Sequence, residues 1–156
     1  MPGAGIFTLD NSDLNRGNLG TRVSHPGCEA MSASDHRSHV VLVVDDEILI
    51  RSNAAEALRD CGCTTYEAAE ADEAMQVLEE HPDISVLFTD INMPGRRDGI
   101  ALAGAVNDRR PDVHLILTSG RERPAPASIP DDWQFIAKPY DLGVVTGIVA
   151  ALPRKD

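Results

Sequence analysis

The chain has 156 residues, 42% of them apolar, which is enough for one domain with a core and too few for two of ordinary size. Its net charge is −11, and residues 39–156 hold 21 of the 25 acidic side chains, so this region repels the phosphates of nucleic acids. This argues against a nucleic-acid partner, and the sequence lacks the long apolar run or signal pattern that would predict a membrane span or export. Three cysteines without a spaced framework are typical of a reducing compartment, so we expect a cytoplasmic protein.

The first 38 residues differ in composition from the rest. Residues 1–38 are rich in Gly, Ser, Asn and Asp and show no sustained apolar period, which predicts a disordered leader. Eight residues separate Met31 from the first apolar run, and translation from Met1 and from Met31 are both compatible with the sequence. We predict that residues 39–153 form the folded domain and that 154–156 are a tail.

The folded part alternates short apolar runs with amphipathic stretches. The run Val40–Val44 is apolar throughout, which predicts a strand covered on both faces. The next stretch has Leu58 on its apolar side and Arg51 and Arg59 on its solvent side. Strands that alternate with helices predict an α/β fold on a parallel sheet. The expected strands are 40–44, 64–68, 84–89, 113–118 and 133–137, and the expected helices are 47–60, 72–81, 98–110 and 141–152.

Residues 121–130 depart from this alternation. They contain Pro124, Pro126 and Pro130 where a further helix is expected, and a proline inside a helix costs about 3 kcal/mol. We therefore predict a loop there, and a fourth helix that is short or absent.

Polar side chains follow four of the predicted strands. Asp45 and Asp46 follow the first strand, Asp90 the third and Lys138 the fifth, and Thr118 ends the fourth. Because loops at the carboxyl ends of parallel strands converge, we expect these side chains to meet at one edge of the sheet. Crowded carboxylates repel one another unless a cation neutralises them, and an all-oxygen site suits Mg²⁺.

Lys138 and Thr118 complete this constellation. Lys138 is one of two lysines in the chain, and at a strand end its amine can reach the carboxylates and hold a phosphoryl oxygen. The Thr118 hydroxyl can donate to another such oxygen. The residue types together predict a phosphoacceptor site in which Asp90 is the nucleophile.

The segments VVLVVDDE, LFTDINMPGRRDG, LILTSG and FIAKPYD resemble the motifs of response-regulator receiver domains of two-component signalling, of the chemotaxis-like single-domain type. The ordered set, in which Asp90 follows Asp46 by 44 residues, covers residues 39–153. The resemblance implies a doubly wound five-stranded parallel sheet of flavodoxin-like order 2-1-3-4-5.

The resemblance also implies roles for single residues. Asp90 would be phosphorylated from a histidine kinase or histidine phosphotransfer protein, with Thr118 and Lys138 assisting. Thr118 and Phe135 would form the switch that reports phosphorylation, and Lys138-Pro139 would be a cis peptide. The implied Mg²⁺ ligands are Asp46, Asp90 and the Asn92 carbonyl, with Asp45 acting mainly through water.

Several alternatives remain open at this point. No output domain is evident, so we expect a stand-alone response regulator that signals through an unknown protein and is not an enzyme beyond its own phosphotransfer and dephosphorylation. A phosphorelay shuttle or a phosphate sink fits equally. The resembling family commonly forms dimers through its fourth helix, fifth strand and fifth helix, and the proline-rich segment predicts that this protein does not form that dimer. A haloacid-dehalogenase-like phosphatase would need Asp-x-Asp after the first strand, whereas Asp45 and Asp46 are adjacent.

Overall fold

A computed structural model describes residues 38–93, 98–120 and 129–153. In this part of the chain the five strands form one parallel sheet in the order β2-β1-β3-β4-β5, as the resemblance implied. None of the helices described is long and apolar enough to cross a membrane. In chain order the elements are β1 (Val40–Val44), α2 (Ile48–Asp60), β2 (Thr64–Ala68), α3 (Ala71–Glu80), β3 (Val86–Asp90), α4 (Gly99–Arg109), β4 (His114–Ser119), β5 (Gln134–Ala137) and α5 (Leu142–Ala151).

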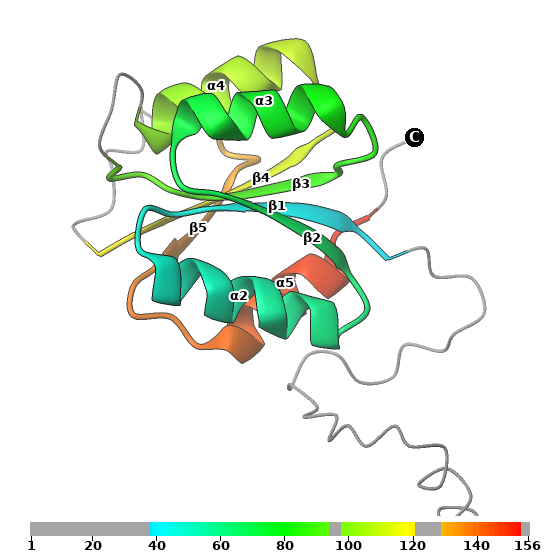
Figure 1. Cartoon of the computed structure of the whole chain (residues 1–156), viewed down its shortest axis with the longest axis vertical. Helices are drawn as coiled ribbons and strands as arrows, with labels where there is room; N and C mark the ends of the chain where they lie inside the picture. Colours follow the sequence, from blue (N-terminus) through cyan, green and yellow to red (C-terminus); the bar gives the residue numbers. More distant parts are fainter. Residues whose placement is uncertain (1–37, 94–97, 121–128, 154–156) are drawn as a thin grey trace, which may run out of the picture.

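The sheet separates two apolar clusters. Figure 1 shows α3 and α4 on one face of the sheet and α2 and α5 on the other. Leu42 and Val44 of β1 pack in the cluster under α3 and α4, while Val41 and Val43 pack in the cluster under α2 and α5. Burial on both faces explains why β1 is apolar at every position and not only at every second one.

The helix expected at 141–152 is present, and it is not the helix that we expected to be short or absent, which belongs to residues 121–130. The described residues contain four helices, and the last in chain order, α5, spans ten residues. This helix forms because Asp141 caps its first turn, its side chain accepting a hydrogen bond from Gly143 N–H at 2.7 Å. The proline-rich loop that led to the expectation falls largely on residues 121–128, which lie outside the described residues, and it stays a prediction.

The side chains of His39 and Arg110 tie elements together at the edge of the sheet where the strands begin. The His39 ring contacts Ser85 Oγ at 2.9 Å and the Leu152 carbonyl oxygen at 3.0 Å, which links the end of α5 to the start of β3. The Arg110 guanidinium donates to the carbonyl oxygens of Pro82 at 2.8 Å and Ile84 at 2.6 Å. These contacts give His39 a structural role at this edge of the sheet.

The Arg110 contacts yield a prediction about stability. Arg110→Met should lower the free energy of unfolding by about 1–3 kcal/mol, because it leaves carbonyl groups of the turn before β3 without their charged donor. Arg109→Met is the matched control, since the Arg109 side chain is 62% exposed and has one long contact, 3.7 Å, with Glu79. Urea unfolding of both variants checks this, and equal losses would contradict it.

Candidate functional site

The residues predicted to form the site come from four neighbouring strands. Asp45 follows β1, Asp90 ends β3, Thr118 lies next to the end of β4, and Lys138 follows β5. Asp90 and Thr118 are partners in the register of β3 and β4, so their backbones lie side by side. The parallel sheet thus brings together side chains that are up to 93 residues apart in sequence, as between Asp45 and Lys138.

Three carboxylates form what we call the acidic cluster: Asp45, Asp46 and Asp90. One oxygen of each lies within 4.8 Å of the others, a spacing that a single metal ion can bridge. Asp45 and Asp90 are 2% and 4% exposed, whereas Asp46 is exposed. The cluster is therefore closed on the protein side and open to an incoming group beside Asp46.

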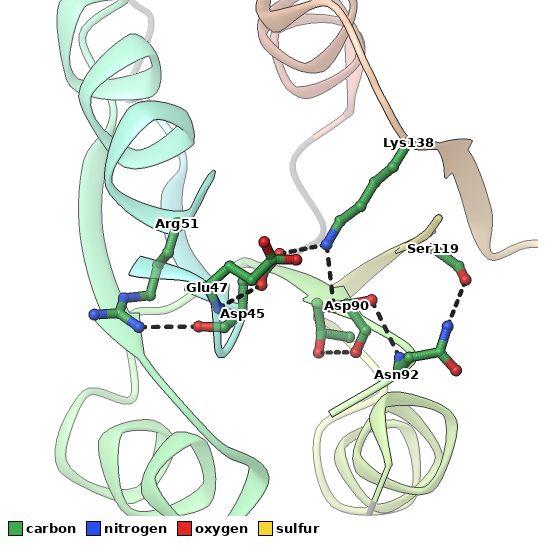
Figure 2. Close-up of polar contacts among 8 residues, drawn as sticks. Asp45, Glu47, Arg51, Asp90, Asn92, Ser119 and Lys138 are labelled. Carbon is green, nitrogen blue, oxygen red and sulfur yellow. Dashed lines mark hydrogen bonds and ion pairs between the residues drawn. The ribbon is translucent and has the colours of Figure 1, made fainter. Parts of the chain in front are cut away.

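The Lys138 amine lies between two of these carboxylates (Figure 2). Its Nζ donates to Asp45 Oδ2 at 2.8 Å and to Asp90 Oδ2 at 3.1 Å. The peptide bond between Lys138 and Pro139 is cis, as the resemblance implied. The remaining oxygens are also held, because Asp45 Oδ1 accepts from the Glu47 N–H at 2.9 Å and Asp90 Oδ1 from the Asn92 N–H at 3.1 Å.

Burial and ion pairing oppose each other in setting the proton affinities. Burial raises the pKa of Asp90 above its usual value of 3.8, and although the bonds from Lys138 and Asn92 lower it, the net direction is upward. Burial lowers the pKa of Lys138, but its hydrogen bonds to Asp45 and Asp90 outweigh burial and raise it above 10.5. Lys138 is therefore a fixed cation at neutral pH.

The switch residues that the resemblance implied occupy different environments. Thr118 is 2% exposed, and its Oγ1 is a buried hydroxyl without a hydrogen-bond partner among the described residues. Phe135 lies on β5, partly buried against the cluster under α3 and α4. Buried hydroxyl groups are rarely left unsatisfied, so the Thr118 hydroxyl is a donor available for a group entering the site.

Three residues that support the site were missed or misplaced by the sequence reasoning. Arg51, expected on the solvent side of its helix, is 15% exposed and donates to the Asp45 carbonyl at 2.9 Å (Figure 2). It turns inward because Glu67 on β2 accepts from its Nε at 3.2 Å. Ser119 accepts a bond from the Asn92 side chain, and Gly99 allows α4 to begin against the backbone of Asp90. No local pattern marks such contacts, because each partner lies on another element.

A cavity adjoins the site on the side of α2 and α5. It has a volume of about 470 Å³, and Tyr140, which lines it, also packs its ring against Phe88 at a centroid distance of 5.5 Å. Burial and the charge of Asp45 raise the pKa of Tyr140 to about 12, so its phenol stays neutral. The lining residues are Ile50, Asn53, Gly120, Lys138, Pro139, Tyr140 and Leu142.

Known proteins resemble this chain throughout the described domain. Residues 41–149 match the family described as the response regulator receiver domain. The sensor kinase CckA of Brucella abortus is 32% identical over 124 residues, 76% of this chain and 13% of that protein. The transcriptional regulatory protein PdtaR of Mycobacterium tuberculosis is 34% identical over 119 residues, 73% of this chain and 57% of that protein.

A solved structure of the receiver domain from the hybrid histidine kinase CckA is also similar. It is 32% identical, with a TM-score of 0.61, over 70% of this chain and 94% of that one. The chain belongs to the response-regulator receiver-domain family of two-component systems. It spans only part of the length of the two curated relatives, 13% of one and 57% of the other.

The close approach at Gly99 gives a matched pair of substitutions. A Cβ at Gly99 would overlap the carbonyl oxygen of Asp90, whereas a Cβ at Gly104, in the same helix, meets nothing within 4 Å. Gly99→Ala should cost about 1–3 kcal/mol or more of stability, and Gly104→Ala should be neutral or stabilise by up to about 1 kcal/mol. Thermal unfolding of both variants checks this, and a stable Gly99→Ala protein would contradict it.

The raised pKa of Asp90 predicts that the acidic residue lowers stability. In EDTA at pH 7, Asp90→Asn should raise Tm by a few degrees, since about 1 kcal/mol shifts Tm by roughly 3–6 °C in a domain of this size. Neutral Asn avoids burial of a charge, so the advantage should shrink as the pH falls through the raised pKa toward 3.8 and Asp90 becomes neutral too. Calorimetry at several pH values checks this, and a lower Tm at pH 7 would show that the pair with Lys138 outweighs burial.

Proposed function

We propose that this receiver domain accepts a phosphoryl group on Asp90 from a phosphohistidine of a histidine kinase or histidine phosphotransfer protein. The observation that carries the proposal is the placement of Asp90 beside a fixed cation, Lys138, and a buried hydroxyl, that of Thr118, which has no hydrogen-bond partner in the part of the chain that the structure describes. Such a constellation supplies positive charge and a hydrogen-bond donor for the oxygens of a transferring phosphoryl group.

The residues around Asp90 also fit a magnesium ion. Asp46, Asp90 and the Asn92 carbonyl would hold Mg²⁺, with Asp45 acting mainly through water, because the acidic cluster offers hard oxygen ligands within 4.8 Å and an open side at Asp46. When bound, Mg²⁺ supplies positive charge that offsets the charge of the phosphoryl oxygens. The ligand set is too small to enclose the ion, which leaves room for a phosphoryl oxygen and water.

The reaction then follows from the positions of the side chains. A carboxylate oxygen of Asp90 attacks phosphorus, the oxygen–phosphorus bond forms, and the nitrogen–phosphorus bond of the donor histidine breaks with its electron pair returning to the ring. Lys138 stays within reach of a phosphoryl oxygen, and Thr118 donates its hydroxyl hydrogen to another. As Thr118 turns toward the phosphoryl group, it opens space that Phe135 can fill. The surface near β5 changes as a result.

The surface beside the site suits a protein donor. Ile48 and Leu49 at the start of α2 are 62% and 74% exposed, and Val144 on α5 is 50% exposed. Exposed apolar side chains on this rim, next to the cavity of about 470 Å³, fit the apolar face of a partner that presents its phosphohistidine to Asp90. Because a phosphohistidine donor is formed where ATP is used, we propose a cytoplasmic location. We also propose that the output is carried by contact with a further protein.

Phosphorylation by a small donor with a nitrogen–phosphorus bond tests the acceptor role without a choice of kinase. With phosphoramidate and Mg²⁺, the wild type should gain one phosphoryl group per chain, seen by intact mass and removed by hydroxylamine. Asp90→Ala should gain none, and EDTA should abolish the reaction. Lys138→Met should be slower by roughly 100-fold or more, the cost of losing a charge that faces the transition state.

Asp72→Asn is the matched control, because Asp72 is an exposed carboxylate in the first turn of α3. It should react like the wild type. A wild-type protein that gains no phosphoryl group from phosphoramidate or from any histidine kinase would overturn the proposal. Return of the group from Asp90 to a histidine phosphotransfer protein would favour a phosphorelay shuttle over a terminal regulator.

A further inference from the structure

A side-chain hydrogen bond joins the loop after β3 to the end of β4. The Asn92 Nδ2 donates to Ser119 Oγ at 2.7 Å (Figure 2). Ser119 is the last residue of β4 and is 1% exposed, whereas Asn92 is exposed in the loop. The bond therefore ties an exposed loop residue to a buried residue of the sheet.

The backbone of the same loop residue faces the acidic cluster. The Asn92 N–H donates to Asp90 Oδ1 at 3.1 Å, and the preceding residue, Ile91, donates to the Thr118 carbonyl at 2.8 Å. After Ile91 the bond to Ser119 is the contact that holds Asn92 against β4. Asn92 is thus held from two sides, by its backbone N–H on Asp90 and by its side chain on Ser119.

We propose that Ser119 is a positioning residue, whose hydroxyl holds Asn92 so that the Asn92 carbonyl and N–H point at the acidic cluster before a ligand arrives. This inference rests on the proposed function, because it assigns Ser119 to the binding of Mg²⁺ at that site. A ligand group that is ordered in advance loses less conformational freedom on binding. A neutral hydrogen bond of this kind changes an equilibrium constant by about 3- to 10-fold.

The choice of Ser119 avoids a confounding effect of charge. Removing its hydroxyl leaves the three carboxylates, Lys138 and the net charge unchanged, so a change in Mg²⁺ affinity reports geometry. Ser119→Ala also adds no volume to a buried position, so overpacking is avoided. A substitution of Arg51 would lack this advantage, because it would alter the charge beside Asp45 as well.

The test compares Mg²⁺ affinity, measured by titration calorimetry on the full chain, with the rate of phosphorylation by phosphoramidate. Ser119→Ala should raise the Kd for Mg²⁺ by about 3- to 10-fold, and the larger part of the loss should appear in Kd and not in the rate at saturating Mg²⁺. Asn92→Ala should raise Kd by the same factor. The double variant should be no worse than either single one, because both remove the same bond.

Ser85→Ala is the matched control. Its hydroxyl contacts His39 at 2.9 Å and accepts from the Val40 N–H at 3.1 Å at the opposite edge of the sheet. This variant should lower Tm and leave the Kd for Mg²⁺ at the wild-type value. It separates a general loss of stability from a loss of positioning.

Each outcome decides the inference. A Ser119→Ala protein that binds Mg²⁺ within about 2-fold of the wild type, or a double variant whose losses add, would overturn it. If Ser119→Ala does not fold, Asn92→Ala gives the same test from the exposed side of the bond, and an unchanged Kd there overturns the inference. A wild-type protein that neither binds Mg²⁺ nor accepts phosphate overturns the proposed function itself.

Discussion

The Lys138 amine, 2.8 Å from Asp45 and 3.1 Å from Asp90, is the contact on which the site depends. Two nearly buried carboxylates facing each other would repel, and burial already raises the pKa of Asp90. The amine makes this arrangement tolerable in the folded protein, and it can do so only if β1, β3 and β5 end at the same edge of the sheet. The strand order and the chemistry are therefore parts of one constraint: a sheet in another order would bury like charges without their counterion.

Much of the fold follows from local patterns. The bounds of β1 and β2 equal the predicted ones. For β1 the reason is that its continuous apolar run ends sharply at the polar residue Asp45. The start of β3 was misjudged by two residues, since Ile84 is as deeply buried as the strand although it lies in the preceding turn. The meeting of the acidic cluster with Lys138 was also predictable, because the ends of parallel strands converge.

The supporting contacts were not predictable in the same way. Arg51 occupies a polar position of an amphipathic helix, and only the tertiary neighbour Glu67 draws it inward to the Asp45 carbonyl. The bond between Asn92 and Ser119 spans 27 residues and joins two side chains that carry no motif of their own. Hydrogen bonds between elements depend on positions accurate to a few tenths of an ångström, and periodicity in a sequence does not contain that information.

The reactive side chains stand at strand ends and the exposed apolar side chains stand on a helix, and this division has a consequence for how such proteins diverge. Asp90, Thr118 and Lys138 stand at the ends of strands, whereas the exposed apolar side chains nearest the site, Ile48 and Leu49, belong to α2. If the proposed donor docks on these side chains, substitutions on the outer side of α2 or α5 after a gene duplication would change which partner is recognised and leave the strands untouched. Insulation between signalling pathways would then evolve by a few surface replacements, while the strand-end residues are inherited unchanged.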